Sequence, residues 1–504
     1  MITDNCIGYE HSARSGKFIQ AVNTSTLESL PEHFTVATSE EVNQALQKAV
    51  QAWRIYRIMP AEKKAEFLEG IATGIEALGQ DLIHRIMLET AYPEPRVIVE
   101  RNRTCAQLRM FAKEVRSGIW TEETIDEALP DRSPAPRPLL RKIMMPVGPV
   151  VVFGASNFPL AYSTAGGDVA SALAAGCPVI VKAHDSHLGT HALVSEAILH
   201  AAKSTGMPDG VFSSLNGDGI ETGKLLVTHP DTAAVGFTGS RQGGRALFDL
   251  GQQRPHPIPV FAEMGSVNPV FLLPGKVAEN PAQLADQLVA SMTMTVGQFC
   301  TNPGVLVAID NEETQKLINR LAEALENTPE AHMLNDRILK SFHSGVATIT
   351  NYDGIKMKVN RSHVGAPMAA PALAIVQASI FIDTPQLQEE IFGPYSIIVL
   401  CSSTDEMLHV AAQLDGQLTA SIHAVPGESE MIESLVEVLV EKAGRLVLNG
   451  VPTGVEVCAA MTHGGPYPAS TDSRFTAVGP FAIRRWLRPV TFQNFTDIGL
   501  TNGL

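Results

Sequence analysis

Short apolar runs alternate with helical stretches from about residue 141 to residue 449, and this alternation constrains the fold more than any other feature. The clearest runs are 149–154 (PVVVFG) and 178–182 (PVIVK). Both are apolar throughout their centres, which is typical of strands buried on both faces of a parallel sheet. Alternation of such strands with helices predicts an α/β fold with helices on both faces of each sheet.

Two sets of strands follow from this pattern. The first set continues through 210–215, 233–237 and 259–262. The second set comprises 268–273, 304–309, 397–400, 420–424 and 445–449. Helices are expected between them, at 161–175, 189–204 and 312–326. Before residue 121, periodic apolar positions predict a helix beginning at Ser39 and further helices at 61–78, 81–90 and 94–118.

Charge and composition exclude several classes of protein. The 504 residues carry a net charge of −15, and no long Lys/Arg run is present, so neither nucleic acid nor an anionic membrane is an expected partner. Two uncharged stretches, 144–167 and 288–309, contain too many Pro, Asn, Thr and Gln residues for a membrane span. The six cysteines form neither a CxxC pattern nor a zinc-type cluster, which indicates a reduced, cytoplasmic protein without a metal site.

Three residues have the side chains needed for covalent catalysis. Cys300 lies in the small polar loop GQFCT, where a thiol is accessible to a substrate. Glu263 ends an apolar run, and burial there would raise its pKa towards that of a general base. Asn157 follows the strand at 149–154, and its amide is a potential oxyanion donor. Taken singly, these residues fit a buried cysteine, a capping or salt-bridging carboxylate and an Asx turn better than they fit a catalytic site.

A cofactor signal comes from the sequence VGFTGS at 235–240, followed by Gly243 and Gly244. It predicts a strand that runs into a glycine turn and a helix N-terminus, which is a suitable place for a pyrophosphate. The spacing differs from GxGxxG, so the ordinary dinucleotide fingerprint is absent. Lys182, at the end of 178–182, is suited to contact a ribose hydroxyl or a phosphate, or to lie in solvent at the strand end.

Six features in one order resemble the aldehyde dehydrogenase superfamily. They are Asn157, Lys182, GFTGS, the glutamate segment EMGS at 263–266, the cysteine segment GQFCTNPG at 297–304 and EEIFGP at 389–394. The resemblance covers nearly the whole chain. It implies two parallel-sheet α/β domains, a Rossmann-like cofactor domain and a catalytic domain, plus a small β oligomerisation ribbon. The implied cofactor is NAD or NADP, and the implied partners are a small aldehyde and further copies of the chain in a homodimer or homotetramer.

The resemblance also assigns roles by position. Cys300 would be the nucleophile, Glu263 the base that activates the deacylating water, and Asn157 an oxyanion donor. Addition of the thiolate to an aldehyde would give a thiohemiacetal, and loss of hydride would leave a thioester for water to open. The implied cofactor-binding residues are Lys182, Asp185, Phe237, Gly239, Ser240, Gly244, Glu390 and Phe392. A carboxylate at Asp185 would favour NAD, but its short side chain leaves the choice of NAD or NADP open.

Departures from the usual family motifs indicate a branch. Ser156 precedes Asn157 where the family commonly has Trp, and EMGS replaces ELGG. Near the C-terminus, HGGPYPAS at 463–470 replaces a PFGG-type segment. These features resemble the 2,5-dioxopentanoate (α-ketoglutaric semialdehyde) dehydrogenases, with NADP-dependent fatty-aldehyde dehydrogenases as the alternative. A carboxylate-bearing substrate requires a cation, for which Arg474 and Arg241 are candidates unless both simply lie on the surface.

The resemblance implies a domain division that the structure can be compared with. The cofactor domain is expected to comprise 1–127 and 147–264, and the catalytic domain 265–462. The oligomerisation segments are expected at 128–146 and 475–504. Three rival functions remain: a cysteine hydrolase, a non-catalytic protein on the same fold, and a CoA-acylating dehydrogenase. The dinucleotide motifs disfavour the first, and the presence of Glu263 together with Cys300 disfavours the other two.

Overall fold

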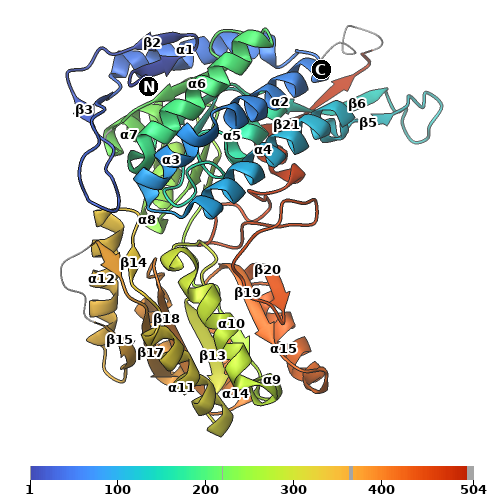
Figure 1. Cartoon of the computed structure of the whole chain (residues 1–504). Helices are drawn as coiled ribbons and strands as arrows, with labels where there is room; N and C mark the ends of the chain where they lie inside the picture. Colours follow the sequence, from blue (N-terminus) through green and yellow to red (C-terminus); the bar gives the residue numbers. More distant parts are fainter. Residues whose placement is uncertain (1, 218, 362–366, 496–504) are drawn as a thin grey trace.

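The computed structural model describes residues 2–217, 219–361 and 367–495, and it contains two seven-stranded sheets. Each sheet is the centre of one α/β body, and the two bodies lie one above the other in Figure 1. The first sheet has the order β11-β10-β7-β8-β9-β1-β2, and the second has the order β15-β17-β18-β13-β12-β19-β20. The predicted α/β class with two mainly parallel sheets is confirmed.

The first sheet contains all the strands expected between residues 149 and 263. Its parallel strands are β7 (Val150–Phe153), β8 (Val179–Lys182), β9 (Phe212–Leu215), β10 (Ala234–Thr238) and β11 (Val260–Glu263). Two N-terminal strands extend it in antiparallel fashion, β1 (Asn5–Ile7) and β2 (Glu10–Ser12). A separate pair is formed by β3 (Phe18–Ile19) and β4 (Phe34–Thr35). These short N-terminal strands were not predicted, because two or three residues are too few to show a period.

The helices of the first body agree with the expected periodicity, with one exception. They are α1 (Ser39–Tyr56), α2 (Ala61–Ala77), α3 (Gly79–Thr90), α4 (Glu94–Ser117), α5 (Gly167–Ala175), α6 (Leu188–Ser204), α7 (Ile220–Thr228) and α8 (Arg241–Gln252). The helix expected at 161–175 begins only at Gly167. The preceding residues form turns, and a Cβ on Gly166 would lie 2.5 Å from the carbonyl oxygen of Ala161. This close approach of the backbone to itself excludes a regular helix there.

The second sheet contains the five strands expected there and adds two. Its strands are β12 (Val270–Leu272), β13 (Val305–Ile309), β15 (Lys356–Asn360), β17 (Ala372–Gln377), β18 (Tyr395–Cys401), β19 (Gln417–His423) and β20 (Ala443–Leu448). Only β15 is antiparallel to its neighbour. The additional strands are β15, whose lysines obscure its apolar positions, and β17, whose alanines do not distinguish strand from helix. The short strands β14 (Ala331–His332) and β16 (Met368–Ala369) pair beside this sheet.

Seven helices among the described residues belong to the second body. They are α9 (Pro274–Glu279), α10 (Pro281–Thr293), α11 (Glu312–Glu326), α12 (Asp336–Thr350), α13 (Ala378–Asp383), α14 (Thr404–Gln413) and α15 (Ser429–Leu439). The helix predicted at 312–326 is confirmed in full as α11. Within the described ranges, no helix is both long enough and apolar enough to cross a bilayer.

A three-stranded antiparallel sheet joins distant parts of the chain. It has the order β21-β6-β5 and is formed by β5 (Thr124–Asp126), β6 (Leu140–Pro146) and β21 (Leu487–Gln493). In Figure 1 it projects from the side of the first body. Residues 496–504, part of the segment 475–504 considered above, lie outside the described residues.

The segment just before β21 anchors the C-terminal region to the first body. It forms the short 3₁₀ helix η6 (Pro480–Trp486), in which Trp486 is fully buried. The indole Nε1 of Trp486 donates a hydrogen bond of 2.8 Å to the hydroxyl of Ser171 on α5. Beside it, Arg485 forms a 2.6 Å ion pair with Asp168 at the start of the same helix. A buried aromatic side chain and a buried ion pair therefore hold β21 in place.

Replacement of Trp486 by Ala is expected to lower the free energy of unfolding by about 3–5 kcal/mol, because it leaves a cavity and removes the hydrogen bond to the Ser171 hydroxyl. Chemical denaturation followed by far-UV circular dichroism measures the loss. Val99→Ala, which truncates an α4 side chain that is 67% exposed, is the matched control and should change the midpoint little. Equal midpoints for the two variants would contradict this account of the C-terminal anchor.

Candidate active site

The carboxyl ends of the parallel strands in the first sheet bring the predicted residues to one edge. The register pairs Phe153 of β7 with both Phe237 and Lys182, and it pairs Thr238 of β10 with Glu263. Lys182 and Glu263 are thus the last residues of their strands. Residues just beyond these ends share the edge, which is where open α/β sheets bind ligands.

The loop that carries Cys300 has a strained backbone and is held from both sides. Thr295, Val296 and Gly297 have φ angles of 50°, 57° and 64°, in the left-handed region that β-branched residues avoid. Glycine is required at 297, because a Cβ there would lie 2.3 Å from the carbonyl oxygen of Gly393. Strain of this kind persists only where the surroundings enforce it, and it is concentrated at functional sites.

Two asparagine side chains enforce that conformation. The amide Nδ2 of Asn157 donates to the carbonyl oxygen of Gln298 at 3.0 Å. On the other side, Nδ2 of Asn268 donates to the carbonyl oxygen of Cys300 at 2.9 Å. Asn157 is buried, and its main-chain carbonyl accepts hydrogen bonds from the hydroxyl of Tyr92 and the guanidinium of Arg96. The structure therefore places Asn157 directly against the cysteine loop.

Cys300, His463 and Glu263 form a compact cluster. The Sγ of Cys300 lies 3.6 Å from Nε2 of His463, and that nitrogen lies 2.9 Å from Oε1 of Glu263. The side chains of His463 and Glu263 are 2% and 5% exposed, so solvent screens their interaction little. Cys300 is partly exposed, and a ligand in the site can reach its sulfur. One nitrogen of the imidazole thus faces both the thiol and the carboxylate, and the three groups lie within 4.8 Å of one another.

The electrostatics of this cluster favour a neutral thiol and an ionised carboxylate. Burial raises the pKa of Cys300 well above its usual value, and the charges of Glu263 and Glu390 raise it further. Burial is the largest influence on the pKa of Glu263 and pushes it upwards, but His463, the thiol of Cys300 and the charge of Arg485 together leave this pKa below its usual value. Attack by Cys300 therefore requires removal of the thiol proton, and the His463–Glu263 pair is placed to receive it.

Sequence reasoning did not identify His463 as part of the site, although HGG at 463–465 was recognised as a departure. The signal lies in the glycines: a Cβ on Gly465 would lie 2.1 Å from the carbonyl oxygen of Gln417, so only glycine fits there. Further along, Ser470 bridges to Glu263, and the amide of Met264 donates to the carbonyl of Ala469 at 2.8 Å. This segment therefore returns to the end of β11 and brings His463 against Glu263.

The predicted cofactor residues Lys182 and Asp185 form an ion pair with each other. The ammonium Nζ of Lys182 donates to Oδ1 of Asp185 at 2.7 Å. Lys182 is buried, whereas Asp185 is exposed at the end of β8. A ligand that reaches this point meets the carboxylate first, with the ammonium behind it.

The predicted turn after β10 adopts the expected strand–turn–helix form. Ser240 caps α8, its hydroxyl accepting from the amide of Gly243 at 3.2 Å. A Cβ on Gly239 would lie 2.7 Å from the ring of Phe237, and one on Gly244 would lie 2.6 Å from the side chain of Met264. Gly239 and Ser240 are exposed, so the first turn of α8 is open to an anionic ligand.

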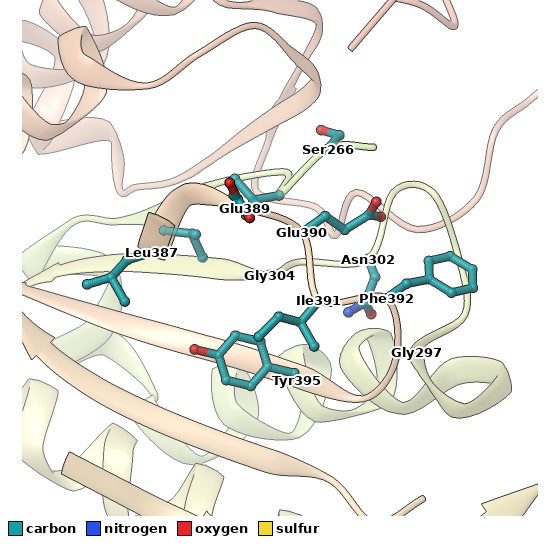
Figure 2. Close-up of a pocket in the computed structure, with 12 residues that line it drawn as sticks. Ser266, Gly297, Asn302, Gly304, Leu387, Glu389, Glu390, Ile391, Phe392 and Tyr395 are labelled. Atoms are coloured by element: carbon teal, nitrogen blue, oxygen red, sulfur yellow. The ribbon is translucent and has the colours of Figure 1, made fainter. Parts of the chain in front are cut away.

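The segment 387–395 faces the cysteine loop across a small pocket shown in Figure 2. Glu390 and Phe392 line this pocket together with Gly297 and Asn302. Glu390 lies close to the backbone of Gly265, where a Cβ would be 2.3 Å from Oε2. Glu390 faces solvent at the recess, but protein surrounds its carboxylate on most sides. The resulting loss of hydration raises the pKa of Glu390 to about 8, and the charge of Glu263 adds to the rise. The pocket connects the predicted cofactor and nucleophile regions.

This arrangement fits a dinucleotide along the edge of the first sheet. The exposed turn at the start of α8 is suited to a pyrophosphate, and the exposed carboxylates of Asp185 and Glu390 are potential acceptors for ribose hydroxyls. Cys300 belongs to the loop just before β13 of the second sheet, and Gly297 and Asn302 of that loop line the pocket of Glu390. The site therefore combines a cysteine nucleophile, a buried base and room for a cofactor.

Comparison with known proteins agrees with this reading of the site. The sequence model of the family described as "Aldehyde dehydrogenase family" matches residues 11–471 of this chain. The chain belongs to the aldehyde dehydrogenase family. A relative from Azospirillum brasilense, alpha-ketoglutaric semialdehyde dehydrogenase 2, is 47% identical over 99% of this chain and 95% of its own length. A second, the alpha-ketoglutaric semialdehyde dehydrogenase of Acinetobacter baylyi, is 42% identical over the same shares of the two chains, 99% and 95%.

Solved structures of aldehyde dehydrogenases share the fold. A lactaldehyde dehydrogenase superposes with a TM-score of 0.84 at 19% identity, covering 98% of this chain and 99% of its own. A Thermus 1-pyrroline-5-carboxylate dehydrogenase with bound NAD gives a TM-score of 0.82 at 20% identity, with coverages of 98% and 92%. The resemblance to the aldehyde dehydrogenase superfamily is thereby confirmed.

Removal of the Glu263 charge is expected to lower the pKa of Cys300 and so to raise its reactivity towards iodoacetamide at pH 7. A lower pKa also reduces the intrinsic nucleophilicity of the thiolate. The alkylation rate at pH 7 is therefore expected to rise only about threefold for each unit by which the pKa falls. The measurement is the second-order alkylation rate of Glu263→Gln against the parent, both carrying Cys458→Ser to remove the exposed thiol. In both proteins the rate should rise with pH as the thiol ionises. A slower or unchanged rate in Glu263→Gln would contradict this electrostatic account.

Proposed function

We propose that this aldehyde dehydrogenase oxidises 2,5-dioxopentanoate to 2-oxoglutarate with NAD or NADP. The observation that carries the proposal is the cluster of Cys300, His463 and Glu263 at the carboxyl edge of the first sheet. The substrate is inferred from the two alpha-ketoglutaric semialdehyde dehydrogenases, which are 47% and 42% identical over nearly their whole length.

The acylation half of the reaction uses Cys300, His463 and Asn157. The thiol proton passes towards the His463–Glu263 pair, and the sulfur adds to the aldehyde carbon. The amide Nδ2 of Asn157 donates one hydrogen bond to the carbonyl oxygen of Gln298, and its second hydrogen is available to the oxyanion. Loss of such a donor typically lowers the rate by about 10²–10³. A bound nicotinamide dinucleotide supplies the hydride acceptor in this reaction.

The deacylation half depends on Glu263. Water must attack the acyl carbon of the thioester, and the buried carboxylate of Glu263 lies in the same cluster as the sulfur that carries it. Because His463 holds the pKa of Glu263 below its usual value, the carboxylate is ionised and ready to accept a proton from water. The C–S bond then breaks, the acid leaves, and the thiolate of Cys300 takes up the proton that Glu263 accepted from water. The proton first removed from the thiol and the proton of the acid pass to solvent.

Several assignments belong to the proposal. The dinucleotide contacts eight residues, which are Lys182, Asp185, Phe237, Gly239, Ser240, Gly244, Glu390 and Phe392. The cofactor domain comprises 1–127 and 147–264, the catalytic domain 265–462, and the oligomerisation segments 128–146 and 475–504. Support for the segments comes from the projecting sheet of β21, β6 and β5, which offers an edge to a second copy of the chain.

We also place the protein in the cytoplasm. All six cysteines are free, three of them fully buried, as in proteins of a reducing compartment. The alternative substrates are medium- or long-chain fatty aldehydes, which need an apolar channel and no cation. The presence of Glu263 beside the sulfur favours water over coenzyme A as the acyl acceptor.

Initial rates of NAD⁺ and NADP⁺ reduction test the substrate. We expect kcat/KM for 2,5-dioxopentanoate to exceed that for hexanal and tetradecanal at least about tenfold, since recognition of a charged group contributes about 1.5–3 kcal/mol. Cys300→Ala should abolish the reduction with every aldehyde. A preference for tetradecanal would instead assign the protein to the fatty-aldehyde enzymes. Reduction that survives Cys300→Ala would exclude the covalent mechanism.

Replacement of Asp185 by Asn is expected to shift cofactor preference towards NADP. The change removes a negative charge that repels a 2′-phosphate and frees the ammonium of Lys182. The ratio of kcat/KM with NADP to that with NAD should rise about tenfold, which corresponds to about 1.4 kcal/mol. Glu437→Gln, a neutralisation at an exposed position on α15, is the matched control. An unchanged ratio in Asp185→Asn would show that Asp185 does not contact the adenosine ribose.

A further inference from the structure

A substrate with a carboxylate needs a cation near Cys300, and neither arginine suggested by the sequence provides it. Arg474 is 79% exposed and pairs with Asp472. Arg241 is 52% exposed and lies 3.9 Å from Asp415. Both therefore lie on the surface, with a carboxylate partner of their own. The cation must come from elsewhere in the site.

Aromatic side chains mark the substrate side of Cys300. The ring of Phe299, next to the nucleophile, packs edge-on against Phe158 at 5.3 Å between centroids. Phe158 packs in the same way against Tyr162, also at 5.3 Å, and Tyr162 lies 5.9 Å from the ring of His463. These rings form a wall that runs from Cys300 to the hydroxyl of Tyr162.

Two arginines from opposite bodies approach this wall. Arg103 comes from α4, and its Nη2 lies 3.5 Å from the hydroxyl of Tyr162. Arg445 comes from β20, and its Nη1 lies 3.9 Å from the sulfur of Met461, two residues before His463. Both side chains reach the loop at 452–455: Arg103 donates to the carbonyl of Val455, and Arg445 donates to the carbonyls of Gly454 and Pro452.

Neither guanidinium is neutralised within the described part of the chain. Arg103 and Arg445 are partly buried, bind only main-chain carbonyls, a phenol and a thioether, and each keeps an Nε without a partner. Other arginines near the site differ: Arg96 is paired with Glu100, and Arg485 with Asp168. Partly buried charges without counter-ions are unfavourable, so two of them close to the nucleophile indicate a place for an anion.

We propose that Arg103 and Arg445 form the subsite that binds the carboxylate of the substrate, with the hydroxyl of Tyr162 as a further donor. The inference rests on the proposed function, which supplies a substrate with an aldehyde at one end and a 2-oxo acid at the other. A carboxylate accepts two parallel N–H bonds from one guanidinium, and the adjacent oxo group adds another acceptor. Discrimination against neutral aldehydes then arises because those aldehydes leave both charges unpaired.

The test compares two aldehydes of equal length, 5-oxopentanoate and pentanal, which differ only in a carboxylate against a methyl group. For Arg445→Met and for Arg103→Met, kcat/KM for 5-oxopentanoate and 2,5-dioxopentanoate should fall about 10- to 100-fold, mainly through KM. Values for pentanal should change less than about threefold. Arg445→Lys, which keeps the charge, should recover part of the loss. Arg101→Met, a partly buried arginine on the same helix as Arg103, is the matched control and should behave as the parent.

Each outcome separates this inference from the proposed function. An equal loss for pentanal and for the charged aldehydes, in Arg103→Met and Arg445→Met alike, would overturn the subsite and leave a structural role for both arginines. A parent enzyme that prefers 5-oxopentanoate to both pentanal and 2,5-dioxopentanoate, with the preference lost in Arg445→Met, would overturn the proposed substrate and support the subsite. A parent without preference for any carboxylate-bearing aldehyde would overturn both. Should Arg445→Met fail to fold, Arg445→Lys and Arg103→Met carry the same comparison.

Discussion

The return of residues 463–471 to the end of β11 is the interaction on which the rest of the site depends. The amide of Met264 donates to the carbonyl of Ala469, Ser470 forms a β-bridge with Glu263, and His463 lies within 2.9 Å of the carboxylate. Gly465 of the same segment admits no side chain, because it passes against the backbone of Gln417 on β19. Without this contact, Glu263 would lose the imidazole of His463 as a neighbour, and burial, which favours the protonated carboxyl, would act on its pKa with less opposition.

The same contact links the two sheets chemically. Glu263 belongs to the first sheet, Cys300 precedes β13 of the second, and His463 follows the last strand of the second. Asn157 and Asn268 hold the cysteine loop from opposite sides, so its left-handed backbone at Thr295–Gly297 is maintained by both bodies. Since the nucleophile and its base come from different bodies, their separation is a property of the packing between the bodies. The proposed arginine subsite is shared between the two bodies in the same way.

The charges of the site are arranged unevenly. Around the thiol, burial opposes ionisation most, and the charges of Glu263 and Glu390 add to it, so the pKa of Cys300 is raised. On the far side of the aromatic wall, Arg103 and Arg445 have no carboxylate partner within the described residues. An aldehyde with an anionic tail is thus attracted at the tail, while its reactive end meets a thiol that stays neutral until a proton is removed.

Much of the fold follows from the sequence alone, because strands buried on both faces leave an unbroken apolar signal. The strands at 150–153 and 179–182 were predictable for that reason, the four N-terminal helices from their apolar period, and the turn at Ser240 from its glycines. Ordered motifs also singled out Cys300, Glu263 and Asn157 as candidates for catalysis, since each proposed role demands one type of side chain. Short edge strands such as β1, and β15 with its alternating lysines, carried no comparable signal.

Only the tertiary structure decided which residues act together. His463 lies 163 residues from Cys300 in sequence, and Arg445 lies 342 residues from Arg103, so no local pattern connects either pair. The same holds for Arg474 and Arg241, which the sequence could not distinguish from a substrate cation and which the structure places on the surface. Side-chain chemistry is a property of each residue and can be read one position at a time. Distance, burial and counter-charge depend on how the two sheets pack, and these determine which of those residues form the site.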